Sequence, residues 1–266
     1  MINKPKQIKS NTELNKLLKS NYIIEPKLDG SRHLVKNEDN KLSILRESGR
    51  LKNDKFPEIL RGLNQIKLPD NTVLDGEVCY QKSDLYADFY NLIPRENLQD
   101  ETRIKYLSGK FPLTFVAFDI LKYDDKDLRN LPYTKRHEIL NKIPENNNFK
   151  IIKNYSFDNF KKLDRSCMEG IVLKKLDSLY SDKWFKHKFY IESDFIVEDY
   201  TSETRLISAL KLIDQDKNYV GKVNYINYPQ TKEFASKLKG MIAVVKHQWT
   251  NQKKIKFPVL KELRSK

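Results

Sequence analysis

The sequence of 266 residues predicts an α+β fold in two domains. Strand-like segments rich in β-branched and aromatic residues dominate, and segments with helical periodicity are interspersed among them. The length exceeds what one typical hydrophobic core fills. From about residue 190 the pattern changes to short strands separated by turns, so we place the domains at 1–190 and 191–266.

The first predicted domain opens with a helix over 11–20, where Leu14, Leu17 and Leu18 share one face after capping residues. Further helices are expected over 134–143 and 158–167. Strands are expected over 41–46, 72–80, 113–121, 170–175 and 183–190. Strands in this number, with helices beside them, predict antiparallel sheets with flanking helices.

The second predicted domain reads as a small β-barrel. Residues 205–213 and 218–223 flank the turn DQDK and predict a hairpin. A helix-like segment at 229–240 precedes a strand at 241–250. Several short strands with one helix suit an oligonucleotide-binding (OB) fold.

The charge of the chain suggests a polyanionic partner. The formal net charge is +14, and the basic residues are spread along the chain. Lysine and arginine bind nucleic acid because neutralised phosphates release their counterions. Charge alone fits a lysine-rich solvated surface equally well. With 39% hydrophobic and 32% charged residues, the chain can bury a core.

Other classes of protein are disfavoured. Cys79 and Cys167 are the only cysteines, and they lie far apart, so we expect neither a structural zinc site nor a disulfide framework. No run of about 18 apolar residues occurs, so we expect a protein of the cytoplasm, or of a host cytoplasm if the source is viral, that does not bind a membrane.

Charged residues lie inside two predicted strands, although neither a GxxxxGK[ST] loop nor a GxGxxG motif occurs. Asp75 and Glu77 are two residues apart and share a strand face. Lys186 and Lys188 likewise share a face with Trp184, and two such lysines can point at one phosphate. Each segment by itself also fits a half-exposed strand with a solvated polar face.

Taken together and in order, the segments resemble the ATP-dependent DNA ligases of the covalent nucleotidyltransferase superfamily. Lys27, Asp29, Gly30 and Arg32 match the KxDGxR motif, with Glu25 just before it. The other matching blocks are Arg46 and Gly49 with FPE at 56–58, DGE at 75–77, Phe118 with Asp119, Glu169 and Gly170 with Lys174, and WFKHK at 184–188. The likeness is greatest to small bacterial and viral ligases and to the ligase domain of bacterial end-joining ligases.

The resemblance implies an adenylation domain followed by an OB domain, and a catalytic group made of Lys27, Lys186 and Lys188. Lys27 would attack the α-phosphorus of ATP and form a lysyl-AMP phosphoramidate. A free lysine has a pKa of about 10.4, so only on the order of one in a thousand is neutral at pH 7. The neighbouring Lys186 and Lys188 would disfavour a third ammonium and neutralise charge on the α-phosphate.

The ATP-binding residues that the resemblance implies are Glu25, Lys27, Arg32, Arg46, Glu77, Phe118, Lys174, Lys186, Lys188 and Arg264. Phe118 would stack on adenine, and Arg46 would face the phosphate of a nick. Glu77 and Glu169 would hold Mg²⁺, or Mn²⁺ in its place. A regular strand would put Glu169 and Lys174 on opposite faces, so we expect Glu169 at the strand entry, with an unusual backbone at Gly170. For Asp29 and Asp119 a structural role is as plausible as a catalytic one.

The last segment, KIKFPVLKELRSK, resembles the block that closes over ATP, but its expected Asp is missing beside Arg264. These cations could instead contact the DNA backbone. The implied partner is nicked duplex DNA bound by a monomer, with an accessory DNA-binding partner left open. Alternatives are an RNA ligase or a capping guanylyltransferase of the same superfamily, and a non-catalytic nucleic-acid-binding protein.

Overall fold

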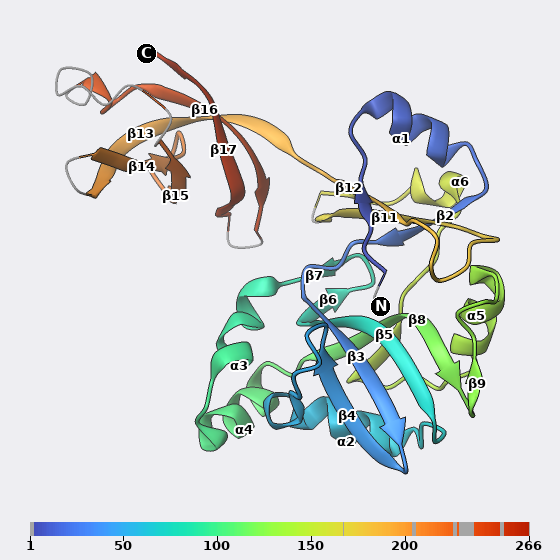
Figure 1. Cartoon of the computed structure of the whole chain (residues 1–266). Coiled ribbons are helices and arrows are strands. Elements are labelled where there is room, and N and C mark those ends of the chain that lie inside the picture. The colour runs from blue at the N-terminus through green and yellow to red at the C-terminus, as the bar shows by residue number, and fades with distance from the viewer. Residues whose placement is uncertain are drawn as a thin grey trace. The chain divides into compact units, whose positions relative to one another are not determined.

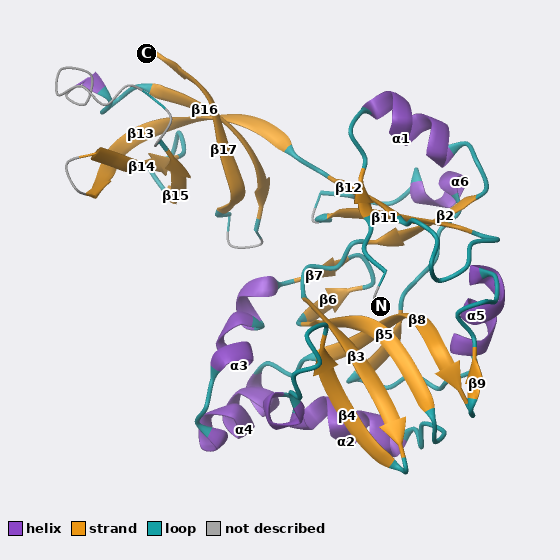
Figure 2. Ribbon diagram, viewed as in Figure 1, coloured by secondary structure: helices purple, strands orange, loops and turns teal. Residues whose placement is uncertain are grey.

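The computed structural model describes residues 3–166, 168–203, 206–225, 228, 237–250 and 253–265. The chain divides into two compact units, Met1–Lys188 and Phe189–Lys266, each of which is described by itself. The mixture of sheets with flanking helices confirms the predicted α+β class (Figures 1 and 2). No helix of the described ranges is long and apolar enough to cross a membrane.

The first unit contains two sheets and a hairpin. Its strands are β1 (Lys6–Gln7), β2 (Tyr22–Pro26), β3 (Ser31–Glu38), β4 (Lys41–Arg46), β5 (Thr72–Cys79), β6 (Gln81–Ser83), β7 (Tyr86–Ala87), β8 (Thr114–Tyr123), β9 (Lys126–Asp127), β10 (Phe149–Ile151), β11 (Gly170–Lys175) and β12 (Phe185–Lys188). The large sheet has the order β10-β8-β5-β3-β4, with β9 paired to β8, and the small sheet has the order β1-β12-β11-β2.

Helices cover the outer faces of these sheets (Figure 2). They are α1 (Asn11–Leu18), α2 (Pro57–Gln65), α3 (Ile93–Asn97), α4 (Glu101–Lys110), α5 (Tyr133–Leu140) and α6 (Phe157–Phe160), with short 3-10 turns at Asn53–Lys55 and Phe89–Asn91. Ile59 and Leu63 of α2 pack on Val35, Ile44 and Leu74 of the large sheet, all fully buried. The main core therefore lies between α2 and the large sheet.

Most of the predicted elements occur at their expected places, but two differ. The helix expected over 158–167 ends at Phe160, after which Lys162 and Leu163 donate their backbone N–H three residues back, to Asn159 and Phe160, and tighten the chain into a turn. Its last expected residue, Cys167, lies outside the described residues. The strand expected over 183–190 is confined to Phe185–Lys188. The helix expected over 229–240 falls largely outside the described residues.

The second unit is one antiparallel sheet that curls on itself. Its strands are β13 (Ile191–Glu203), β14 (Leu206–Ile213), β15 (Tyr219–Asn224), β16 (Ile242–Trp249) and β17 (Ile255–Arg264), in the order β15-β14-β13-β16-β17. A Cβ added to Gly221 of β15 would lie 2.6 Å from the Ile255 side chain of β17, so the two edge strands approach closely. Such a curled five-stranded sheet is an OB-like fold.

Gly170 lies at the start of β11, where this strand runs very close to β12 of the small sheet. The backbone at Gly170 is ordinary, since the glycines with positive φ are Gly49, Gly221 and Gly240, so the expected unusual conformation is wrong. The reason for glycine is close approach: an added Cβ would lie 2.2 Å from the backbone oxygen of His187.

We therefore expect Gly170→Ala to lower the free energy of unfolding by roughly 1–3 kcal/mol, because backbone must move to admit the methyl group. Gly109→Ala is the matched control, since nothing lies within 4 Å of its Cβ position in α4. There alanine should be neutral or stabilise by up to about 1 kcal/mol. Urea denaturation of both variants measures the difference, and equal stabilities would contradict the close-approach argument.

Candidate active site

A pocket lies between the two sheets of the first unit. Its lining residues are Pro5, Glu25, Pro26, Lys27, Leu28, Arg32, Glu77, Phe118, Ile152, Val172, Lys174, Trp184 and Lys186. Strand register explains how they meet. In the small sheet Glu25 and Lys186 both pair with Val172, and in the large sheet Arg32 pairs with Glu77. Each sheet thus contributes a row of charged side chains to the pocket.

Lys27 follows β2 and is held beside a buried carboxylate. Its Nζ donates to Oε2 of Glu169 at 2.7 Å, and Nζ of Lys188 lies 2.8 Å from Oε1 of the same residue. Glu169 immediately precedes β11, which agrees with the expected position at the strand entry. One carboxylate therefore holds two of the three predicted catalytic lysines.

Lys186 completes this group of cations. Burial lowers the pKa of its ammonium, and the charges of Lys27 and Lys188 lower it further. Three ammonium groups around one carboxylate leave a surplus of positive charge in the pocket. This surplus suits a phosphate group, whose oxygens would take the place of water around the lysines.

Arg32 reaches the pocket from β3 and is fixed by Asp75. Its Nε and Nη2 donate to the two oxygens of that buried carboxylate at 2.9 and 2.5 Å. Tyr180 donates its hydroxyl to the same carboxylate at 2.7 Å. The sequence placed Asp75 on a strand face with Glu77 and in the DGE motif, but it did not indicate Tyr180, which lies outside every motif block named above.

Aromatic rings form the apolar wall of the pocket. Phe118 lies edge-on to Trp184, with ring centroids 5.9 Å apart. The Arg32 guanidinium lies 5.1 Å from the Phe118 ring centroid, and the Lys174 ammonium lies 4.9 Å from it. A flat base would find a ring surface here, with cations near its edge.

Glu77 is a half-buried carboxyl on the pocket wall. Burial raises the pKa of its carboxyl group to about 8, although Lys27 and Arg32 act in the opposite direction. No described residue donates a hydrogen bond to it. Its charged form therefore lacks the stabilisation that a bound cation would supply.

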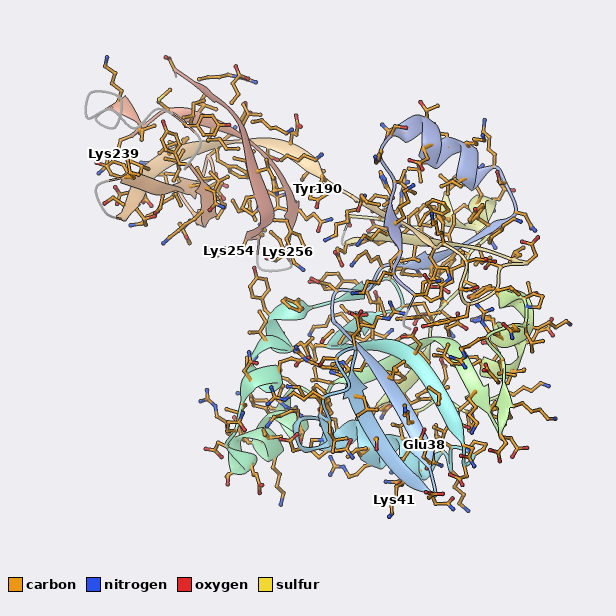
Figure 3. The ribbon with its side chains drawn as sticks, viewed as in Figure 1. Glu38, Lys41, Tyr190, Lys239, Lys254 and Lys256 are labelled. Carbon is orange, nitrogen blue, oxygen red and sulfur yellow. The ribbon has the colours of Figure 1, made fainter. Side chains whose placement is uncertain are left out.

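This pKa predicts a pH-dependent gain in stability for Glu77→Gln. An unfolded chain releases this proton near pH 4.5, so the wild type loses unfolding free energy as the pH rises from about 4.5 to 8, and the loss then levels off. The amide cannot ionise, so the variant should be more stable by up to about 4 kcal/mol at pH 8 and no more stable at pH 4.5. Urea denaturation across this range checks the trend. Glu38→Gln at the exposed tip of the β3–β4 hairpin is the control (Figure 3).

Glu77 and Glu169 are the two carboxylates predicted to hold a divalent cation, and both oxygens of Glu169 contact lysine ammonium groups in this structure. Glu77 and Glu169 are close enough for the charge of Glu169 to raise the pKa of Glu77. Within the described ranges no three His, Cys, Asp or Glu side chains gather as a metal site. Magnesium commonly takes one or two carboxylates and completes its shell with water and phosphate oxygens, so the pair fits it.

Arg46 is not among the residues that line this pocket, and Arg264 belongs to the second unit. Arg46 donates to Oε2 of Glu96 through Nε at 3.1 Å and lines a separate opening beside Glu47 and Ser48. Arg264 belongs to β17 of the second unit, where its Nε donates to Glu262 at 3.0 Å. Contact of either residue with nucleotide stays a prediction.

Asp119 has a structural role in the first unit. Its two oxygens accept from Nε and Nη2 of Arg136 at 2.8 and 3.0 Å, and both side chains are fully buried. A buried, doubly bonded pair of this kind anchors α5 on β8. Of the two roles considered for Asp119, the structure favours the structural one.

The fold is that of a nucleotidyltransferase domain. The family model of the ATP dependent DNA ligase domain matches residues 1–188, and the chain belongs to this family. A curated relative is the SPbeta prophage-derived DNA ligase-like protein LigB of Bacillus subtilis, 28% identical over 194 residues, which are 69% of this chain and 67% of the relative. Two further ligase relatives are matched over only 28% and 54% of their own length.

Solved structures of two ligases share the fold. A Lig E DNA ligase, described as binding DNA with a minimal scaffold, matches with a TM-score of 0.65 at 16% identity, over 99% of this chain and 98% of that one. The ligase domain of LigD from M. tuberculosis matches with a TM-score of 0.58 at 18% identity, over 99% and 95%. At these identities the likeness concerns the fold alone.

Proposed function

We propose that this protein is an ATP-dependent DNA ligase that seals nicks between a 5′-phosphate and a 3′-hydroxyl in duplex DNA. Residues 1–190 would be the adenylation domain, and residues 191–266 the OB domain. The observation that carries the proposal is the position of Lys27, inside a pocket with Glu169, Lys186 and Lys188 around it. Membership of the ligase-domain family supports the same reaction.

In the first step Nζ of Lys27 attacks the α-phosphorus of ATP. A nitrogen–phosphorus bond forms, the bond from that phosphorus to the bridging oxygen breaks, and pyrophosphate leaves with the electron pair. The ammonium of Lys27 must first lose a proton, which passes to solvent. Lys186 and Arg32 lie where they can neutralise charge on the α-phosphate as it develops.

The second and third steps transfer AMP to the 5′-phosphate of the nick and join the strands. The 3′-hydroxyl then attacks the activated phosphate, and AMP leaves. Glu77 and Glu169 would hold the divalent cation, which screens phosphate charge when it is bound. The acceptor oxygens of Glu77 lack donors from the described residues, which leaves them open to such an ion.

The second unit offers cations and rings for nucleic acid. Lys246, Lys254 and Lys256 lie 4.7–4.9 Å from the ring centroids of Tyr190, Tyr219 and Phe257, which are all exposed. Figure 3 labels Lys254 and Lys256 next to each other at one end of this unit. We infer that Lys246 and Lys254 contact DNA phosphates, with an affinity that falls steeply as salt rises, whereas the Lys256 nitrogen is buried. A monomer acting on DNA in the cytoplasm is the simplest setting for this reaction.

The deciding experiment incubates the protein with Mg²⁺ and α-phosphate-labelled ATP or GTP, separates it on a denaturing gel, and adds nicked 5′-phosphorylated DNA as a chase. A band labelled by ATP that disappears as a sealed strand forms is the expected result. Labelling by GTP would place the protein with capping guanylyltransferases. Transfer only to RNA-containing nicks would mark an RNA ligase, and no covalent label would leave a nucleic-acid-binding protein.

Phe118→Ala should weaken the use of ATP more than the sealing of a nick that already carries AMP. The ring supplies binding area for adenine in the first step, so its loss should raise KM for ATP by roughly tenfold, the effect of one ring contact of about 1 kcal/mol or more. Steady-state labelling and single-turnover sealing of a pre-adenylylated nick measure the two effects. An equal loss in both assays would remove the stacking role.

A further inference from the structure

A polar cluster behind the inner end of the pocket takes no part in the steps above. Tyr133 of α5 donates its hydroxyl to Oε1 of Glu25 at 2.7 Å, and Nζ of Lys174 lies 2.9 Å from the same oxygen. Asn154 donates from Nδ2 to the Tyr133 oxygen at 2.9 Å. The His137 ring stacks on Tyr133, with Nδ1 3.3 Å from the hydroxyl. Glu25, Tyr133 and Lys174 are buried.

These contacts orient the Tyr133 hydroxyl. The hydroxyl has one proton and two acceptors, Oε1 of Glu25 at 2.7 Å and Oδ1 of Asn154 at 3.1 Å, and the shorter contact with the carboxylate takes it, while Nδ2 of Asn154 donates to the hydroxyl oxygen. Burial, together with the nearby charge of Lys174, lowers the pKa of His137 to about 4, so the imidazole is neutral at pH 7. The cluster thus directs one neutral donor and one ammonium at Oε1 of Glu25.

The other carboxylate oxygen of Glu25 is left for a ligand. Oε2 accepts no hydrogen bond from the described residues, and Glu25 lines the pocket. Lys174 also lines the pocket and donates to the backbone oxygen of Phe118 at 2.6 Å. An ammonium has three N–H groups, so one donor remains beside the free acceptor of Glu25. The pocket wall therefore presents an acceptor and a donor side by side.

The acceptor of Glu25 and the donor of Lys174 together match the hydrogen-bonding edge of a 6-aminopurine. A 6-aminopurine such as adenine offers a donor at its amino group and an acceptor at the adjacent ring nitrogen N1. A 6-oxopurine such as guanine or hypoxanthine reverses both, with an acceptor oxygen and an N1–H donor. A site built to pair with one pattern rejects the other strongly, because its buried polar groups are then left unpaired.

We propose that Tyr133, held by Asn154 and His137, is a specificity-determining positioning residue that makes this pocket select a 6-aminopurine nucleotide over a 6-oxopurine nucleotide. It acts through Glu25, whose carboxylate it fixes as an oriented acceptor. This inference rests on the proposed use of ATP and deepens it. Without the hydroxyl, Oε1 keeps only Lys174, and the carboxylate gains freedom to turn or to take up a proton. The Glu25 carboxyl group could then also hydrogen-bond to the oxygen of a 6-oxopurine.

The test compares ATP with inosine triphosphate (ITP), since the two differ only in the 6-substituent and the N1 proton. For Tyr133→Phe we expect the ratio of kcat/KM for lysine labelling with ATP to that with ITP to fall about tenfold. A rise in KM for ATP should cause most of this fall, with kcat changing less than about threefold. Tyr123→Phe is the control, because its hydroxyl makes no hydrogen bond to the described residues. It should leave the ratio unchanged.

An unchanged ATP-to-ITP ratio in Tyr133→Phe would overturn the inference, even if both rates fell, since general loosening lowers both alike. Asn154→Ala provides a second variant at a half-buried position and should shift the ratio in the same direction by about threefold. Equilibrium binding of ATP and ITP separates this inference from the proposed function. A preference for ATP that Tyr133→Phe removes supports the inference even without covalent labelling, and equal binding by the wild type contradicts it.

Discussion

Lys27→Ala is expected to abolish covalent labelling by ATP and sealing of an ordinary nick. The amine that attacks the α-phosphorus in the proposed first step is Nζ of Lys27, and an alanine methyl group cannot form the phosphoramidate. The neighbouring Lys186 and Lys188 remain in place, so phosphate binding should survive. A denaturing gel after incubation with labelled ATP should show no band, which corresponds to a loss of more than about 10⁴-fold.

The same variant should still seal a nick that carries AMP on its 5′-phosphate. The third step breaks the bond between the two phosphates and needs no bond to lysine. Lys19→Ala serves as the control, because this lysine is exposed at the end of α1. Retained labelling in Lys27→Ala would mean that another residue is the nucleophile. Loss of sealing on the pre-adenylylated nick would give Lys27 a second role.

Glu169→Gln should give the second largest loss, about 10²-fold in the rate of labelling. Its carboxylate holds Lys27 at 2.7 Å and Lys188 at 2.8 Å, so it decides where both nitrogens lie before ATP arrives. The amide keeps the shape but carries no charge and can accept through one oxygen only. The nucleophile would then be free to turn away from the phosphorus, and the divalent cation would lose one proposed ligand.

The effect should appear in kcat more than in KM for ATP, because the aromatic wall and Lys174 are untouched. Single-turnover labelling at saturating ATP and several Mg²⁺ concentrations measures it. Glu145→Gln is the matched control, since this carboxylate lies in a different opening of the same unit. Labelling at the wild-type rate would show that Lys27 does not depend on Glu169 for its position.

The sequence by itself predicted the short helices and strands whose apolar pattern and end signals all lie within about ten residues. The strand expected over 41–46 is β4, because Leu42 and Ile44 alternate along it, and the strands expected over 72–80 and 170–175 are β5 and β11, where β-branched residues favour a strand. The helix expected over 11–20 is α1, since its cap and apolar face both lie in the segment. The helix expected over 158–167 was too long, because the chain tightens into a turn after Phe160, where Leu163 donates to the Phe160 oxygen.

The ordered motifs also indicated which residues gather, since Lys27, Glu77, Phe118, Lys174 and Lys186 all line one pocket. The partners of these residues could not be predicted in the same way. Lys27 and Glu169 are 142 positions apart, and Glu25 and Tyr133 are 108 apart. Such pairs depend on how β2, β11 and α5 pack, which no periodicity within a segment encodes.

Tertiary structure alone decided the electrostatic state of the pocket. From the sequence, Glu77 is one acidic residue in a strand; in the folded chain, burial between two sheets raises its pKa to about 8. Arg46 likewise belongs to a motif block, yet Glu96 draws its guanidinium to another opening. The sequence by itself determined which chemical groups the chain carries and which short segments hold them. Only the packed fold decided their neighbours and their exposure to water, because solvation and charge pairing act between segments that meet in space.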